Sequence, residues 1–222
     1  MIAVDIDGVL LRDTFSPVLR ELVEELGGTY SSEIERRLFS RPQYDAAESL
    51  IEVLHLDIDP GELIDLFFDR RKRFIEANGA GLEEGVPEFL QLLDSLDVPL
   101  VCYGGLSESY FQAELGEWCG YFARYICTND FRPGVKEIIR DISKLEFEQS
   151  LFIDDVNTVA ETAKMLNVPF IGCPASHAWG HQREAMMKTG VQFLISSVRD
   201  IDGRYIEKID MAAAQNGVWS RS

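Results

Sequence analysis

The sequence is short of long apolar runs, of basic residues and of paired cysteines, and each shortage excludes a class of protein. Its apolar runs are only a few residues long, whereas a membrane-spanning helix needs about 20 residues, and the first run is too short for a signal-peptide core. The chain has only 21 lysine and arginine residues but 38 acidic residues. Its formal net charge of −17 repels the phosphate backbone of nucleic acid. We therefore expect a cytoplasmic protein that binds neither membranes nor nucleic acid.

Cysteine and histidine are also too few and too scattered to indicate a zinc site or a disulfide framework. The four cysteines have no CxxC spacing, and there are only three histidines. His177 and His181 have the i, i+4 spacing of a helical metal pair, but no acidic third ligand accompanies them. Histidines on the protein surface are therefore the better interpretation of this pair.

Residues 15–81 show only helical patterns. Ser16-Pro17 predicts a helix N-cap followed by proline at the first helical position, and Ser32 with Glu35 predicts a capping box. Asp59-Pro60 predicts the start of the longest helix of this segment. With 222 residues, of which 46% are hydrophobic, the chain can bury one core together with such a smaller lobe.

After Gly85, short apolar runs alternate with amphipathic helices, which is typical of a parallel sheet built from βα units. We predict strands at 2–4, 100–103, 125–127, 151–153, 170–171 and 193–195. We predict helices at 88–96, 108–115, 135–145, 158–166 and 182–188. The sequence thus predicts a three-layer, Rossmann-like α/β core from residues 1–14 and 82–222, interrupted by a helical cap at 15–81. An insert directly after the first strand would cover the carboxyl edge of the sheet, where such folds bind ligands.

Two pairs of carboxylates follow predicted strands. Residues i and i+2 of a strand point the same way, so Asp5 and Asp7 can address one site, and Gly8 lets the chain turn sharply. Asp154-Asp155 follows the strand at 151–153. Aspartates at strand ends are also common as turn formers and helix caps, but two pairs at one sheet edge can converge on a hard cation such as Mg²⁺.

The motifs DIDGVL (5–10) and FIDD (152–155), with a helical insert between them, resemble the haloacid dehalogenase superfamily. The insert is similar to the small helical cap of its phosphoglycolate phosphatase and β-phosphoglucomutase branch. The resemblance implies that Asp5 is a nucleophile and that Asp7 is a general acid/base which also ligates metal through its backbone carbonyl. It implies that Asp155 is a metal ligand, with Asp154 as its neighbour or a second ligand. Members that hydrolyse halides lack the second acid of the first motif, so Asp7 favours phosphate-ester chemistry.

Two further motifs of the family match less closely. Tyr103-Gly104-Gly105 stands where the family usually has a Thr or Ser that binds the phosphoryl group. The Tyr103 phenol, the hydroxyl of Ser107 or backbone amides of the two glycines could bind substrate instead, although a core tyrosine beside a glycine turn is an equal interpretation. The family's cation corresponds to Arg132, by its position before proline and a helix, or to Lys136, by residue type. Arginine can grip phosphate with two hydrogen bonds, whereas lysine acts as a point charge.

We therefore expect a Mg²⁺-dependent phosphatase that acts on a small phosphorylated metabolite through an aspartyl-phosphate, as a monomer or homodimer. A phosphomutase of the same fold would share every core residue. A weakly catalytic regulatory protein that binds a ligand or metal is the alternative from another class. The altered motif at 103–105 favours that alternative, and the two intact carboxylate pairs oppose it. The basic run at 70–73 could steer a phosphate toward the site or simply form a solvated helix face.

Overall fold

The computed structural model describes residues 1–215 and 217–219, and a parallel sheet lies at its centre. Its five strands have the order β3-β2-β1-β4-β5. The central strand β1 (Ile2–Asp5) lies between β2 (Leu100–Gly104) and β4 (Leu151–Asp154), while β3 (Arg124–Cys127) and β5 (Phe170–Gly172) form the edges. All four strand pairs are parallel, so their carboxyl ends meet at one edge of the sheet.

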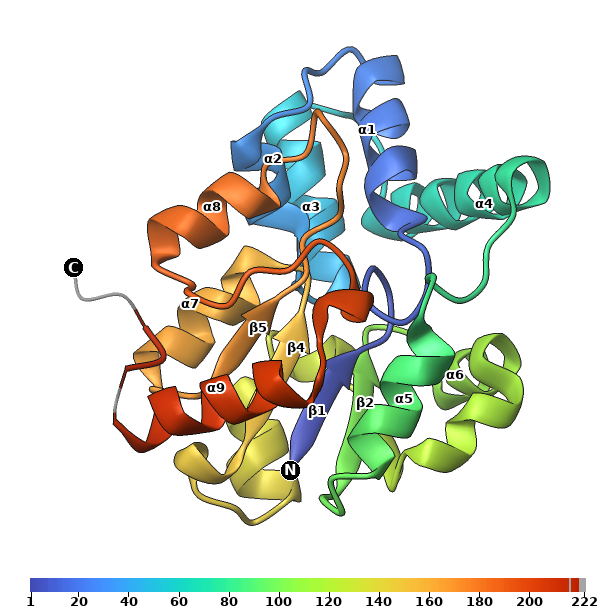
Figure 1. Cartoon of the computed structure of the whole chain (residues 1–222). Helices are drawn as coiled ribbons and strands as arrows, with labels where there is room; N and C mark the ends of the chain where they lie inside the picture. Colours follow the sequence, from blue (N-terminus) through green and yellow to red (C-terminus); the bar gives the residue numbers. More distant parts are fainter. Residues whose placement is uncertain (216, 220–222) are drawn as a thin grey trace.

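Helices cover both faces of the sheet (Figure 1). One face packs against α5 (Val86–Asp94), α6 (Glu108–Leu115) and α9 (Gly203–Ala214). The other face packs against α7 (Asn157–Met165), α8 (Gln182–Thr189) and a short π-helix (Glu137–Ile142). Neighbouring strand residues alternate between the two cores, as Ala3 and Val4 do, so β1 is apolar on both sides. This arrangement confirms the predicted three-layer α/β class.

The helical insert, defined as residues 15–81, has a hydrophobic cluster of its own. It consists of α1 (Phe15–Glu25), α2 (Ser32–Leu38), α3 (Gln43–Leu54) and α4 (Pro60–Asn78). Its two connections to the sheet lie side by side, because Leu11 and Leu82 form an antiparallel bridge. The Arg12 amide also donates to the Gly81 carbonyl at 3.0 Å. The insert therefore lies over the carboxyl edge of the sheet (Figure 1).

The predicted helix starts of the insert are partly correct. Asp59 caps α4 as expected, accepting a backbone amide hydrogen bond of 2.8 Å. At the start of α1, however, the carboxylate of Asp13 accepts two amide hydrogen bonds of 2.9 Å, and Ser16 lies inside the helix. The hydroxyl of Ser31, rather than that of Ser32, caps α2. The expected capping box is absent, because the side chain of Glu35 instead accepts hydrogen bonds from the His181 amide and the Gln182 side chain at the start of α8.

Three other elements differ from the sequence prediction. The predicted strand at 193–195 forms only a bridge between Gly172 and Leu194, because β5 itself ends at Gly172 and offers no longer edge. The predicted helix at 135–145 begins at residue 135, as expected, but it is a π-helix from Glu137 to Ile142 and ends there. Helix α9 was not predicted. Among residues 1–215 and 217–219, no helix is both long and apolar enough to cross a membrane.

Candidate active site

The structure brings the two predicted carboxylate pairs together at the carboxyl edge of the sheet. Asp5 ends β1 and Asp154 ends β4, and these two strands are direct neighbours. The side chains of Asp5, Asp154 and Asp155 are buried, and with Asp7 all four line one cavity. Strand order alone therefore accounts for a cluster of acids that are up to 150 positions apart in the sequence.

Gly8 allows the loop after β1 to pass close to the second carboxylate pair. Its φ angle of +90° lies in the region that favours glycine. A Cβ atom at this position would lie 2.3 Å from Oδ2 of Asp155, which is closer than two such atoms can approach. The glycine of the first motif is therefore required by both its backbone conformation and the approach of Asp155.

The clustered carboxylates disfavour one another's ionised forms. Burial raises the pKa of Asp5 well above its usual value, and the negative charge of Asp154 raises it further, against the attraction of Arg132. Burial likewise raises the pKa of Asp155, and the charges of Asp154 and Asp5 add to this effect. Ionising the whole cluster would thus place more negative charge in the site than Arg132 balances, and a divalent cation would offset that charge.

Asp154 and Asp155 differ in the number of hydrogen bonds that their carboxylate oxygen atoms accept from the protein. The hydroxyl of Tyr103 donates to Oδ2 of Asp154 at 2.5 Å, and the amide of Val156 donates to Oδ1 at 2.7 Å. Within the part of the chain that the structure describes, the carboxylate of Asp155 accepts no hydrogen bond from a side chain or a backbone amide. The carboxylate of Asp155 is therefore the freer of the two to ligate a cation.

The expectation that Tyr103 binds substrate is not supported by its position. Its side chain is only 2% exposed, packs beside Phe152 and does not line the cavity. The carbonyl of Gly104 accepts hydrogen bonds from the amide and hydroxyl of Thr128, at 2.8 and 3.0 Å, and Gly104 also lies outside the lining. Only Gly105 of this motif lines the cavity. The phenol instead orients Asp154 by donating to it across the intervening strand β1.

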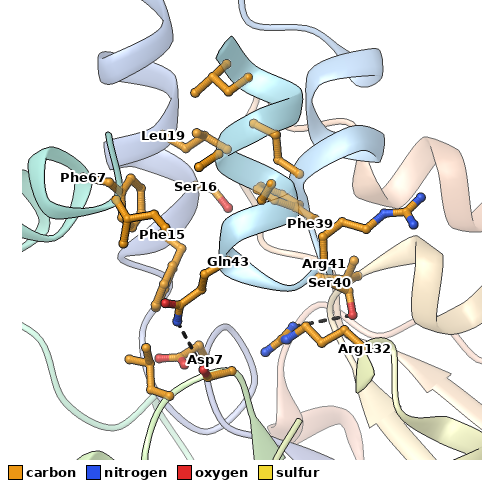
Figure 2. Close-up of a pocket in the computed structure, with 18 of the residues that line it drawn as sticks. Asp7, Phe15, Ser16, Leu19, Phe39, Ser40, Arg41, Gln43, Phe67 and Arg132 are labelled. Atoms are coloured by element: carbon orange, nitrogen blue, oxygen red, sulfur yellow. Dashed lines mark hydrogen bonds between the residues drawn. The ribbon is translucent and has the colours of Figure 1, made fainter. Parts of the chain in front are cut away.

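Of the two candidate cations, the structure places Arg132 in the site. Arg132 lines the cavity, and a Cβ added to Gly105 would lie 2.5 Å from its guanidinium, so the missing side chain at 105 makes room for it. Its Nη1 atom lies 3.5 Å from the hydroxyl of Ser40 in the insert (Figure 2). Lys136 is exposed and does not line the cavity. Ser107, the other candidate hydroxyl, instead caps α6.

Two residues near Asp7 were not singled out from the sequence. The hydroxyl of Tyr110, on α6, donates to Oδ1 of Asp7 at 2.6 Å. Arg71, on α4, donates to the Tyr110 oxygen at 2.7 Å and to the Thr14 hydroxyl at 2.9 Å, and it lies 3.7 Å from Oδ1 of Asp7. Burial raises the pKa of Asp7, and the Tyr110 hydrogen bond and the Arg71 charge oppose that rise.

Within the basic run at 70–73, burial is the property that distinguishes Arg71. Its side chain is 9% exposed, whereas Lys72 and Arg73 are exposed, and Arg70 pairs with Glu25 at 2.5 Å. The sequence identifies the run but contains no signal that selects one of its four members. Tyr110 likewise has no sequence signal, because a tyrosine in an amphipathic helix is ordinary.

The two histidines contact different acidic residues. Nε2 of His177 lies 3.2 Å from the Asp13 carboxylate, and its ring stacks on Trp179 with centroids 4.5 Å apart. His181 contributes its backbone amide to Glu35. The sequence predicted surface histidines, but both residues are partly buried.

The acidic cluster fits Mg²⁺ in its donor chemistry and its charge. In residues 1–215 and 217–219, no group of three His, Cys, Asp or Glu side chains has a geometry that could hold a metal ion. Mg²⁺ does not require such a cage, because it is usually held by one or two carboxylates, waters and substrate phosphate oxygens. The hard oxygen atoms of Asp5 and Asp155, beside an unbalanced buried charge, meet that smaller requirement.

The fold is that of the haloacid dehalogenase-like phosphatases and phosphomutases, which confirms the resemblance at the level of fold. No protein-family model and no curated protein sequence matches the chain. A β-phosphoglucomutase from Clostridium difficile has a TM-score of 0.71 at 12% identity, covering 96% of this chain and 98% of its own. A haloacid dehalogenase-like protein of unknown function from Agrobacterium tumefaciens has a TM-score of 0.67 at 18% identity, covering 96% and 98%. A predicted phosphoglycolate phosphatase from Haemophilus somnus has a TM-score of 0.62 at 14% identity, covering 94% and 96%.

Proposed function

We propose that the protein is a Mg²⁺-dependent phosphatase that hydrolyses a small phosphate monoester through an aspartyl-phosphate on Asp5. The observation that supports it most is the placement of Asp5, Asp7 and Arg132 on the wall of one cavity at the carboxyl edge of the sheet. A protein that only binds a ligand or metal has no need of both acids of this pair. We further propose that it acts in the cytoplasm, as a monomer or homodimer, and that residues 15–81 act as a cap.

The first half of the reaction transfers the phosphoryl group to the protein. A carboxylate oxygen of Asp5 attacks phosphorus, and the bond between phosphorus and the ester oxygen breaks. Asp7 in its protonated form donates its proton to the departing alkoxide, so the alcohol leaves neutral. Arg132 attracts the phosphoryl oxygens and offsets the negative charge that develops on them.

The second half releases phosphate and restores the carboxylates. Asp7, now ionised, accepts a proton from a water molecule that attacks the phosphorus of the aspartyl-phosphate, and the Asp5 carboxylate is released with inorganic phosphate. Asp5, Asp155 and the backbone carbonyl of Asp7 would hold Mg²⁺, with Asp154 beside them. When bound, Mg²⁺ supplies positive charge that reduces repulsion between the carboxylate nucleophile and the phosphate.

The Asp5→Asn variant tests this assignment. We expect the wild-type protein with Mg²⁺ to hydrolyse a generic aryl phosphate, and Asp5→Asn to lose at least about a thousandfold in rate, because an amide cannot attack phosphorus. Mass spectrometry of acid-quenched wild-type protein should detect phosphate on Asp5. The control is Asp94→Asn, the same change at an exposed position at the end of α5, which should keep the wild-type rate. Retention of most of the turnover by Asp5→Asn would show that another group is the nucleophile.

A further inference from the structure

The cavity above the carboxylates extends into the helical insert, where its walls are apolar. Its volume is about 200 Å³. Helices α1, α3 and α4 contribute four lining residues each, and ten of these twelve are apolar, the exceptions being Ser16 and Gln43. Figure 2 shows Leu19 and Phe67 at the end of this space that lies away from Asp7 and Arg132. The cavity therefore has one charged end on the sheet and one hydrocarbon end inside the insert.

The few uncharged polar groups near the charged end are largely engaged with the protein. The Gln43 side-chain amide donates to the carbonyl of Gly105 at 3.3 Å, and the Ser40 hydroxyl lies 3.5 Å from Arg132. A sugar places several hydroxyl groups in its site, and each buried hydroxyl without a partner lowers affinity. The wall supplied by the three helices offers one hydroxyl, that of Ser16, and the segment between α2 and α3 adds only two polar residues, Ser40 and Arg41, to the lining. The insert wall therefore matches an apolar group better than a sugar.

The size of the hydrocarbon end limits what can fill it. An apolar cavity left empty destabilises a protein, because the atoms that line it forgo van der Waals contacts. An apolar cavity of about 150 Å³ is large enough to bind benzene. The whole cavity, charged end included, has a volume of about 200 Å³, so once a phosphate fills the charged end there is room for one aromatic ring or a short alkyl chain of about six carbons.

Resting on the phosphatase function proposed above, we propose that the substrate is a phosphate monoester of an apolar alcohol. Its phosphate lies between Asp5 and Arg132, and its alkyl or aryl group fills the cavity between α1, α3 and α4. Hydrolysis then yields inorganic phosphate and the apolar alcohol. The charged end selects phosphate, and the insert selects the alcohol by excluding water from Phe15, Leu19 and Phe67.

A series of n-alkyl phosphates from ethyl to octyl phosphate, with glucose 6-phosphate for comparison, tests the proposal on the wild-type protein with Mg²⁺. We expect kcat/KM to rise about fourfold for each added methylene, which is the ratio expected for moving one methylene out of water. The rise should level off after hexyl phosphate. From ethyl to hexyl phosphate this amounts to about two-hundredfold, and glucose 6-phosphate should be turned over about a hundredfold less efficiently than hexyl phosphate. Equal values along the series, or a preference for glucose 6-phosphate, would overturn the proposal.

A pair of matched variants locates the alkyl group in the insert. Ala46 on α3 lines the cavity, whereas Ala77 on α4 is exposed and does not. Ala46→Phe should lower kcat/KM for hexyl phosphate about tenfold or more and remove most of the gain with chain length, because the ring occupies the space. Ala77→Phe should reproduce the wild-type series. Thermal unfolding followed by circular dichroism checks that both variants fold, and a folded Ala46→Phe with the full chain-length gain would contradict the assignment.

Calorimetric titration of the Asp5→Asn variant with ethyl and hexyl phosphate in the presence of Mg²⁺, compared with hydrolysis of the same esters by the wild-type protein, separates this proposal from the phosphatase function. If neither ester is hydrolysed but hexyl phosphate binds about fiftyfold or more tightly than ethyl phosphate, the phosphatase function is wrong and the apolar site stands. If both are hydrolysed and bind equally, the apolar site is wrong and the phosphatase function stands. Equal binding without hydrolysis would overturn both.

Discussion

The acid/base role proposed for Asp7 depends on Tyr110, and removal of one hydroxyl tests that dependence. Tyr110 donates to Oδ1 of Asp7 at 2.6 Å and accepts from Arg71 at 2.7 Å, so its phenol links the carboxylate to the guanidinium. Burial raises the pKa of Asp7, and the hydrogen bond from Tyr110 is the largest effect that opposes the rise. The Tyr110→Phe variant removes that hydrogen bond while keeping the ring.

The expected size of the change follows from the strength of the lost hydrogen bond. A hydrogen bond to a charged group contributes about 1.5–3 kcal/mol, and 1.36 kcal/mol corresponds to about one pKa unit. Tyr110→Phe should therefore raise the pKa of Asp7 further, because the hydrogen bond that opposes the effect of burial is lost. A higher pKa keeps Asp7 protonated to higher pH, so the ionised form needed to activate water becomes scarcer on the acidic side. We expect the pH optimum to move up by about one to two units and the rate below it to fall about ten- to a hundredfold.

The assay is the pH dependence of kcat on a generic aryl phosphate between about pH 5 and 9. The matched control is Tyr125→Phe, because the Tyr125 hydroxyl is also partly buried but donates to the carbonyl of Leu106 at 2.8 Å. The control should keep the wild-type profile. If the profiles of Tyr110→Phe and the wild type coincide, Tyr110 does not set the proton affinity of Asp7, or Asp7 does not carry the proton.

Two further predictions concern the cation and the phosphate. Asp155→Asn should weaken Mg²⁺ binding more than Asp154→Asn does, because the carboxylate of Asp154 already accepts hydrogen bonds from Tyr103 and a backbone amide. A Mg²⁺ titration of the activity of each variant measures this, and equal or reversed effects would make Asp154 the main ligand. Arg132→Ala should lower kcat/KM by about a hundredfold or more, the scale for losing a charge-stabilising donor, whereas Lys136→Ala should stay within about threefold of the wild type because Lys136 is exposed and outside the cavity. Steady-state kinetics that rank the two cation variants the other way would assign the phosphate contact to Lys136.

Much of the fold was predictable because the apolar runs of the central strands are unambiguous. Five of the six predicted strands are present, and each is one residue longer than predicted. The sixth predicted strand, at 193–195, is not formed because a strand can extend only as far as the strand it pairs with. Residues 193–195 exchange hydrogen bonds of 2.9 Å with Gly172, where β5 ends. Helix α9 could have been found, since Asp202 caps it and Tyr205, Ile206 and Ile209 have helical spacing.

The acidic half of the site was predictable for a topological reason, and its supporting residues were not. Parallel strands bring their carboxyl ends to one edge, so Asp5 and Asp154 could be paired without knowledge of any side chain. The place of Tyr103 depends on which face of the sheet it occupies and on what packs there. Arg71 is 64 positions from Asp7 in the sequence, and only the packing of α4 against α1 and α3 makes it a neighbour.

The alcohol that leaves in the proposed reaction has to be inferred from the helical insert, because the residues of the sheet are compatible with many different alcohols. The three solved structures compared above are 12–18% identical to the chain, which is enough to support the fold and too little to transfer a substrate. The sheet supplies the carboxylates and Arg132, which address a phosphate irrespective of the alcohol it is joined to. The walls formed by residues such as Leu19 and Phe67 belong to the insert. A sugar-phosphate mutase on the same sheet would need hydrogen-bonding groups on those walls, so their apolar character favours hydrolysis of a hydrocarbon ester over the phosphomutase alternative.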